Sequence, residues 1–294
     1  MDQADKLRQL VQQKSSAPRK VARVITVTSG KGGVGKSSLS VNLAIQFSRM
    51  GKKVIVFDAD FGLANIEIML GIRPQYNIAD LMFRGKNLED IITEGPEGIG
   101  FISGGSGIQE LTMLSREQII FLTQKLFQLD KLADIIIIDT GAGIADSVME
   151  FVAASSEVLL VVTPEPTSIT DAYALLKTLN RKSDFSAKNT KIKMIANRTT
   201  RDSEGLELFD KLAIVSEKFL NIPIEYLGAV PQDANVSKAV IQQKPVSVLY
   251  QNTNASKAIT QLSDKLNDEK VEPVQEKKGM AQLFSNLIKS KHKK

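Results

Sequence analysis

The chain of 294 residues is 43% hydrophobic, carries a formal net charge of +5 and contains no cysteine and one histidine. Without cysteine it has no disulfides, thiolate zinc sites or cysteine-held iron–sulfur clusters, and one histidine excludes a histidine-based triad or an imidazole-ligated metal. Residues 277–294 contribute +6 and residues 1–20 contribute +3, which leaves −4 for residues 21–276 and disfavours a DNA-binding face on the body.

Short β-branched runs alternate with longer amphipathic stretches, the pattern of a parallel sheet covered by helices on both faces. The predicted strands, several of them apolar at every position, are 23–28, 53–58, 100–102, 135–139, 158–163, 191–197 and 226–230. The predicted helices are 37–50, 116–129, 145–155, 168–182, 203–220 and 254–266. We therefore predict an α/β protein with a doubly wound, mostly parallel sheet in a single domain.

The domain, residues 21–266, is predicted to follow a polar arm, residues 1–20. The first ten residues, MDQADKLRQL, lack the apolar core of a secretory signal, and no run approaches the roughly 18 apolar residues that cross a bilayer. We therefore expect a cytoplasmic protein. Residues 267–278, NDEKVEPVQEKK, are charged, aperiodic and contain Pro273, which is typical of a flexible linker.

A glycine-rich segment directly follows the first predicted strand and precedes the first predicted helix. It fits GxxxxGK[ST] and consists of Gly30, Lys31, Gly32, Gly33, Val34, Gly35, Lys36 and Ser37. The glycines let backbone N–H groups close around a β-phosphate, Lys36 reaches the β- and γ-phosphates, and Ser37 offers a hydroxyl to Mg²⁺. We therefore predict ATP or ADP with Mg²⁺ at residues 30–38, Ser38 included; a chance glycine-rich turn is the alternative.

Acidic residues end two of the predicted strands, at the edge where ligands of doubly wound sheets bind. Asp58 and Asp60 share one side of a strand end because side chains alternate along a strand. The apolar run IIII closes with Asp139, which is what an element that holds Mg²⁺ through water requires. For the first pair, the alternative is two solvated strand-end acids.

The last segment, residues 279–294, has the pattern of an amphipathic helix ringed by lysines. Its apolar side chains recur with helical spacing at Met280, Leu283, Phe284, Leu287 and Ile288. This combination favours a helix that lies in the interface of an anionic membrane. One such helix binds marginally, whereas two on a dimer gain by avidity. A helix that packs back on its own domain, or that binds a partner protein, is the alternative.

These segments resemble the deviant Walker A ATPases of the MinD/ParA class: KGGVGKS with its second lysine, DADFGLAN as switch I, and DTGAG as switch II. The resemblance implies slow, Mg²⁺-dependent ATP hydrolysis by a homodimer that forms with ATP. In that class Lys31 reaches the partner's nucleotide, and Asp60 orients or activates the attacking water. Lys31, Lys36 and Asp60 are accordingly the predicted catalytic residues; for Lys31 a solvated lysine is the alternative.

The resemblance also implies where the metal and the base bind. It places Ser37, Asp58 and Asp139 around Mg²⁺. It implies that adenine is clasped by two strand-end segments that contain Asn197, Arg198, Pro231, Gln232 and Asp233. Turn chemistry at strand ends is the alternative for these five residues. The sequence has no guanine-type NKxD segment, so ATP is preferred to GTP.

The arm begins with DQADKLR, which resembles the N-terminal activator segment of one MinD-like group, the flagellar-number regulators FlhG (also called YlxH or FleN). In that group the segment stimulates the GTPase of FlhF, a signal-recognition-particle-type partner, and Gln3, Leu7 and Arg8 are the matching residues here. The resemblance further implies contact with flagellar switch-complex proteins and a peripheral location on the inner face of the cell membrane. A helix start capped by Asp2 is the local alternative. MinD division-site regulators and ParA-type DNA-segregation ATPases are the alternative functions.

Overall fold

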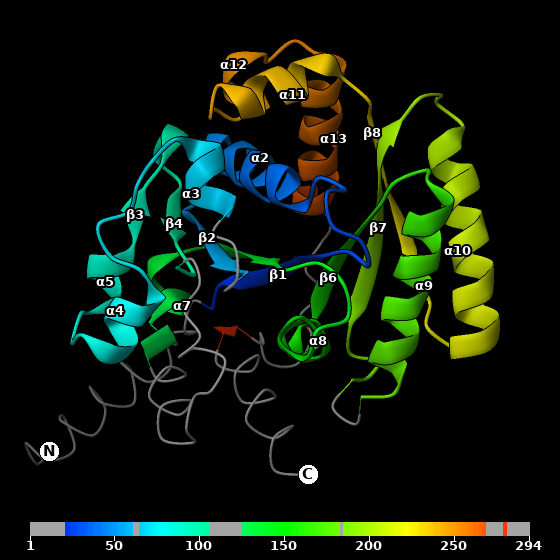
Figure 1. The fold of residues 1–294 in the computed structure, drawn as a ribbon, viewed down its shortest axis with the longest axis horizontal. Coiled ribbons are helices and arrows are strands. Elements are labelled where there is room, and N and C mark those ends of the chain that lie inside the picture. Colours follow the sequence, from blue (N-terminus) through cyan, green and yellow to red (C-terminus); the bar gives the residue numbers. More distant parts are fainter. Residues whose placement is uncertain are drawn as a thin grey trace, which may run out of the picture.

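The computed structural model of the chain describes residues 21–60, 65–105, 125–126, 128–182, 185–268 and 279–280. Within them, one eight-stranded sheet has the order β3-β4-β2-β5-β1-β6-β7-β8 (Figure 1). Its strands are β1 (Arg23–Thr28), β2 (Val54–Ala59), β3 (Thr93–Glu94), β4 (Gly100–Ile102), β5 (Ile135–Thr140), β6 (Glu157–Val162), β7 (Lys191–Thr199) and β8 (Glu225–Pro231). Every neighbouring pair is parallel except β3 with β4, which confirms the predicted doubly wound, mostly parallel sheet.

Helices cover both faces of this sheet. They are α2 (Lys36–Arg49), α3 (Asn65–Leu70), α4 (Ile78–Phe83), α5 (Leu88–Ile91), the 3₁₀ turn η1 (Pro96–Gly98), α7 (Leu129–Leu132), α8 (Asp146–Ala154), α9 (Pro166–Asn180), α10 (Glu204–Leu220), α11 (Ala234–Ile241), α12 (Val246–Leu249) and α13 (Asn254–Asp268). Val56 of β2 packs into the core under α2, α3 and α11 to α13. Its neighbour Phe57 points to the opposite face, which α4, α5, α7 and α8 cover.

The central strands are apolar throughout because helices cover them on both sides. All residues of β2, β5 and β6 are buried, as are all of β1 except Arg23. Because β5 lies between β1 and β2, the acid that ends β5 is brought beside the acid that ends β2, and the pairing register sets Asp139 opposite Asp58. The strand order thus gathers the predicted site at one edge of the sheet.

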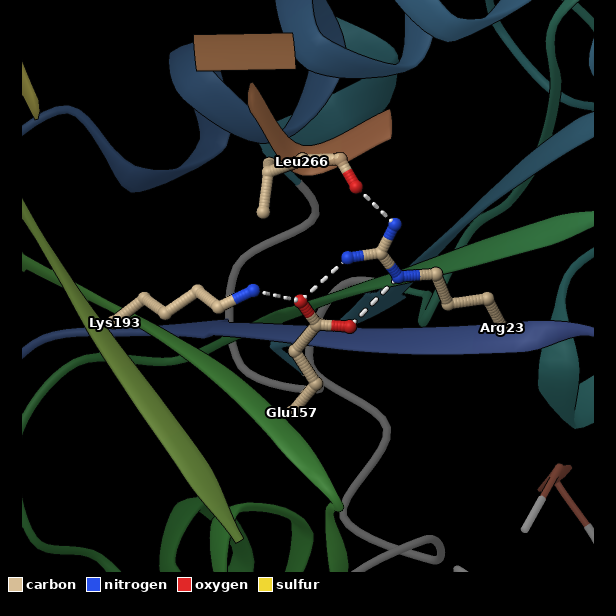
Figure 2. A network of polar contacts seen from close by, with 4 residues as sticks. All are labelled: Arg23, Glu157, Lys193 and Leu266. Carbon is tan, nitrogen blue, oxygen red and sulfur yellow. Dashed lines mark hydrogen bonds and ion pairs between the residues drawn. The ribbon is translucent and has the colours of Figure 1, made fainter. Parts of the chain in front are cut away.

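A charged network joins the amino ends of β1, β6 and β7 to the end of α13 (Figure 2). The Glu157 carboxylate accepts hydrogen bonds from Arg23 Nε at 2.8 Å, from Arg23 Nη2 at 2.7 Å and from Lys193 Nζ at 2.9 Å. Arg23 Nη1 also donates to the carbonyl of Leu266 at 2.5 Å. Lys193 is 1% exposed, so the Glu157 carboxylate takes the place of water around its charge. The network fixes the last turn of α13.

The seven predicted strands are confirmed to within two residues at each end, and β3 adds an eighth. The predicted helices 37–50, 145–155, 168–182, 203–220 and 254–266 correspond to α2, α8, α9, α10 and α13. Most of the predicted helix 116–129 lies outside the described residues. The sequence did not predict α3, α4, α5, α7, α11 and α12, because helices of one or two turns are too short for a clear apolar period.

The described part of the tail lies against the body. The Met280 N–H donates to Asp130 Oδ1 at 3.0 Å, and the Met280 side chain is fully buried in the cluster that contains Leu129. A Cβ on Gly279 would collide with Val21, so the root of the tail touches the root of the arm. Met280, predicted to face a membrane, is therefore inside the domain here. The other predicted membrane and partner residues lie outside the described residues: Leu283, Phe284, Leu287, Ile288, Gln3, Leu7 and Arg8.

None of the described helices has the length and apolar character that crossing a bilayer requires.

Candidate nucleotide-binding site

A cleft of about 1330 Å³ opens at the carboxyl edge of the sheet. Both acidic segments, the glycine loop and the ends of β7 and β8 contribute to its walls. The predicted residues that line it are Gly32, Gly33, Gly35, Lys36, Ser37, Ser38, Asp60, Asn197, Arg198, Pro231, Gln232 and Asp233. Segments more than two hundred positions apart in the sequence therefore share one cavity, which is larger than the roughly 300–1,000 Å³ of a typical small-molecule site.

Two positions of the glycine loop accept only glycine. Gly35 has a φ of +97°, and a Cβ there would collide with the side-chain amide of Asn197. Gly30 lies so close to α9 that a Cβ would collide with the backbone of Asp171. Asn197 Nδ2 donates to the carbonyl of Val34 at 2.7 Å, and Val34 is buried. Gly30 and Val34 therefore hold the loop in place from behind.

The first turn of α2 is suited to bind phosphate. Its N-cap is Gly35, so no side chain satisfies the first N–H groups, and the turn contains no acid. Lys36 is 8% exposed, and burial lowers the pKa of its ammonium against the opposing influence of Asp139 and Asp60. A phosphate here would supply the negative charge and the hydrogen-bond acceptors that these donors lack.

Asp58 and Asp139 form a fully buried pair across β2 and β5. Asp58 accepts the backbone N–H groups of Asp60 at 3.1 Å and of Ile66 at 3.2 Å. Burial, reinforced by the charge of Asp139, raises the pKa of Asp58 to about 8. Burial also raises the pKa of Asp139 to about 6, although nearby serine hydroxyls act to lower it. At neutral pH the pair therefore carries close to one negative charge.

The space beside Ser37 and Asp139 fits Mg²⁺. Asp139 Oδ1 accepts the Ser40 hydroxyl at 2.8 Å, whereas its Oδ2 is buried and makes no hydrogen bond within the described part of the chain. A serine hydroxyl, a carboxylate oxygen and phosphate oxygens are the hard ligands that Mg²⁺ prefers, with water filling its remaining positions. The described residues contain no cluster of three or more acidic or imidazole ligands, so phosphate would have to complete this site. When bound, Mg²⁺ would neutralise phosphate charge.

Asp60, in the first switch segment, faces the second switch segment. Its Oδ2 accepts Asn65 Nδ2 at 3.5 Å, and a Cβ on Gly141 would lie 3.6 Å from its Oδ1. The Gly143 N–H donates to the carbonyl of Ser29 at 2.9 Å, which ties the segment after β5 to the start of the glycine loop. Asp60 is thus in position to accept a hydrogen bond from water in the cleft.

Lys31 is bound to α9 of its own chain. Its Nζ donates to Glu165 Oε2 at 2.6 Å and to Thr167 Oγ1 at 2.8 Å. The Lys31 ammonium holds the pKa of Glu165 below its usual value. Both charged side chains are accessible to water, so the pair is easily exchanged for another partner. Glu165 and Thr167 could not be predicted as partners of Lys31, since nothing in PEPT distinguishes them from an ordinary helix start.

Two of the five residues predicted to contact the base are already hydrogen-bonded to other groups of the protein. Asn197 is bonded to the glycine loop, and Asp233 caps α11 by accepting the Asn235 N–H at 2.8 Å. Arg198 has a φ of +61°, a conformation that non-glycine residues adopt rarely and at a cost of about 1–3 kcal/mol. All five border the cleft, and their contact with adenine stays a prediction.

A glycine loop between a strand and a helix, with buried acids at neighbouring strand ends and a cleft above them, defines a P-loop NTPase. The family model described as "ParA: NUBPL iron-transfer P-loop NTPase" matches residues 20–267. The chain therefore belongs to the ParA family of P-loop NTPases, which includes MinD and consists of ATPases. The iron transfer in that description belongs to the protein it names.

Curated relatives and a solved structure agree with this assignment. Antiactivator FleN of Pseudomonas aeruginosa is 42% identical over 245 residues, 83% of this chain and 86% of FleN. The flagellum site-determining protein YlxH of Helicobacter pylori is 34% identical over 271 residues, 91% of this chain and 90% of YlxH. MinD of Pyrococcus horikoshii, solved with Mg-ADP, shares the fold with a TM-score of 0.65 at 22% identity, over 84% of this chain and 96% of that one. The resemblance to the MinD/ParA class and to the FleN and YlxH group is confirmed.

Proposed function

We propose that this chain is a Mg²⁺-dependent ATPase switch that dimerises when it holds ATP, binds a membrane peripherally and regulates the number or placement of flagella. The observation that carries the proposal is the cleft in which the glycine loop meets Asp60, with the buried pair Asp58 and Asp139 on the neighbouring strands. The flagellar role rests on the names of two relatives, an antiactivator and a flagellum site-determining protein.

The residues of the cleft divide the work of hydrolysis. The N–H groups of the loop and the Lys36 ammonium bind phosphate oxygens, and Ser37 and Asp139 hold Mg²⁺. Asp60 orients a water molecule toward the γ-phosphate. Hydrolysis in this proposal is slow, so that the ATP-bound state serves as a timer. A metal bound beside Asp58 and Asp139 would favour the charged form of both carboxyls, whose pKa values burial raises.

Lys31 supports a dimer in which each chain completes the other's site. It is the only lysine of the glycine loop that is held outside its own cleft in the described structure, by the accessible residues Glu165 and Thr167. When a second copy brings a γ-phosphate within reach, Lys31 exchanges Glu165 for that stronger anion. The dimer then depends on the γ-phosphate and opens after hydrolysis.

The tail links this dimer to the membrane. Its full apolar face includes Met280, which is buried against α7, so lipid binding by all five apolar residues requires Met280 to leave the core. Leaving costs about 1.5–3 kcal/mol for each methionine side chain, which weakens the binding of a single tail, whereas two tails on one dimer gain by avidity. The arm, through Gln3, Leu7 and Arg8, stimulates the SRP-type GTPase partner FlhF.

Molar mass measured by light scattering after size exclusion tests the switch directly. With ADP we expect the 32.2 kDa monomer, and with a non-hydrolysable ATP analogue we expect roughly twice that mass. The protein should sediment with liposomes that contain anionic lipid only when it holds the ATP analogue. One and the same mass with either nucleotide would refute the proposal.

Two variants separate the appendages from the switch. Deletion of residues 277–294 should abolish liposome sedimentation and leave ATP binding intact, and sedimentation that persists contradicts the role of the tail. Gln3→Ala should leave the chain's own ATPase unchanged and lose stimulation of the partner GTPase; equal stimulation by the variant contradicts the role of the arm.

A further inference from the structure

Ser40 is a buried residue of α2 that contacts the candidate metal site. Its hydroxyl donates to Asp139 Oδ1 at 2.8 Å and to the carbonyl oxygen of Lys36 at 3.1 Å, so the carboxylate is the nearer of its two acceptors. Ser40 is fully buried and is not among the residues that line the nucleotide cleft. It therefore acts on a bound nucleotide or metal ion only through the groups that it holds.

Two serines of α2 lie against Asp139, and they differ in what they can reach. Burial raises the pKa of Asp139, and the hydroxyls of Ser37 and Ser40 both act against that rise, so both lie beside the carboxylate. Ser37 is partly exposed and lines the cleft, so its hydroxyl can turn from Asp139 toward a metal ion. Ser40 is enclosed and stays on the carboxylate when Ser37 turns away.

The hydrogen bond from Ser40 determines which oxygen of Asp139 remains for the metal. Oδ1 is engaged by Ser40, whereas the buried Oδ2 makes no hydrogen bond to the residues that the structure describes. The last torsion of an aspartate side chain has no sharp preference of its own, so a hydrogen bond is what holds the carboxylate plane. With Ser40 in place, Asp139 offers the single oxygen Oδ2 to a metal ion or to a water bound to it.

Ser40 also ties the strand-end carboxylate to the helix that carries the phosphate-binding groups. Asp139 ends the apolar run of β5, 99 positions from Ser40 in the sequence, and the two elements meet through this side chain. The donation to the Lys36 carbonyl, one turn earlier in α2, limits the rotation of the Ser40 side chain. The Asp139 carboxylate is thus fixed relative to Lys36 and Ser37.

A carboxylate that offers one oxygen in a fixed direction suits one cation better than another. Mg²⁺ requires near-ideal octahedral geometry and keeps several waters, so one well-placed carboxylate oxygen serves it. Ca²⁺ accepts more ligands in flexible arrangements, and carboxylates bind it with one oxygen or with both. Because Oδ1 is occupied by Ser40, Asp139 is not available to bind a cation with both oxygens.

We propose that Ser40 is a positioning residue of the metal site, which holds Asp139 so that one carboxylate oxygen serves Mg²⁺ and thereby favours Mg²⁺ over Ca²⁺. The inference deepens the proposed function and rests on it, because it takes Mg²⁺ to bind with the nucleotide beside Ser37 and Asp139. Removing a group that hydrogen-bonds to a metal ligand typically lowers metal affinity about 10–100-fold.

The binding of fluorescent ADP to the full chain, titrated with Mg²⁺ or with Ca²⁺, tests this role without measuring hydrolysis. The probe is ADP with an N-methylanthraniloyl group on its ribose. In EDTA, Ser40→Ala should bind the probe as the wild type does, because Ser40 does not line the cleft. With Mg²⁺, the variant should need about tenfold more metal for half-maximal tightening, whereas its Ca²⁺ requirement should change less than about threefold.

Two further variants separate positioning from packing. Ser263→Ala on α13 also removes a fully buried hydroxyl, which donates within its own helix to the Thr260 carbonyl at 2.7 Å. This matched control should follow the wild type with both metals. Ser40→Thr keeps a hydroxyl on the same carbon and should restore the Mg²⁺ requirement to within about threefold of the wild type. Urea unfolding in EDTA confirms that each variant is folded; Ser40→Ala removes one atom and adds none.

Three results would overturn the proposal: a Mg²⁺ requirement of Ser40→Ala equal to that of the wild type, an equal rise in its Mg²⁺ and Ca²⁺ requirements, or probe binding in EDTA weakened as much as the response to Mg²⁺. The last would mean that Ser40 shapes the glycine loop and not the metal site. Failure of the proposed function looks different, because the wild type itself would then bind the probe equally in EDTA and in Mg²⁺.

Discussion

Replacing Asp58 by asparagine should flatten the pH dependence of stability in the nucleotide-free protein. The Asp58 carboxyl has a pKa of about 8 in the fold and an ordinary value of 3.8 when unfolded. Because the folded pKa is the higher one, the stabilisation that comes with the bound proton is lost as pH rises toward 8. Between pH 6 and pH 8 this loss amounts to about 2 kcal/mol.

The neighbouring carboxyl adds little over the same range. Asp139, with a pKa of about 6, contributes below about 0.5 kcal/mol between pH 6 and 8. We therefore expect the unfolding free energy of the wild type to fall by about 2.5 kcal/mol, the sum of the two contributions, and that of Asp58→Asn by less than about 1 kcal/mol. The amide also keeps only one of the two side-chain oxygens that accept backbone N–H groups, and this loss of about 1 kcal/mol does not change with pH.

Urea unfolding at pH 6, 7 and 8 with EDTA and without nucleotide measures the difference. Asp202→Asn, at an exposed aspartate, is the control and should follow the wild type. An equal fall in the wild type and in Asp58→Asn would show that burial does not hold a proton on Asp58, and the argument for a singly charged pair would be wrong.

The other predictions concern the glycine loop, its lysine and the catalytic acid. Gly30→Ala should lower the free energy of unfolding, measured in urea, by at least about 2 kcal/mol, because the new Cβ would collide with the backbone of α9. Gly32→Ala is the control and should change it far less, because the nearest atom to its new Cβ is 3.9 Å away. Glu165→Gln removes the internal partner of Lys31, so sedimentation velocity should show more dimer at limiting ATP; an unchanged or smaller dimer fraction contradicts the exchange. Asp60→Ala should bind ATP but accumulate dimer, and a variant that stays monomeric with ATP excludes the proposed role.

The sheet could be predicted from the sequence because its strands are buried on both faces and read as unbroken apolar runs. The glycine loop and the strand-end acids could be predicted because a phosphate site needs fixed residue types at fixed spacing. The contacts of Lys31 with Glu165 and of Ser40 with Asp139 could not, since they join segments whose approach depends on tertiary packing. Neither could the burial of Met280, because an apolar helix face looks the same in sequence whether lipid or protein covers it.

The contact between Gly279 and Val21 offers a way to watch the tail move in solution. Because Val21 and Gly279 are in contact while Met280 is seated, a pair of dyes attached at these two positions would show energy transfer close to its maximum in that state. Any departure of the tail toward lipid would appear as a loss of that transfer in a single cuvette. Because the pair lies far from the glycine loop along the strands, the dyes would leave nucleotide loading undisturbed.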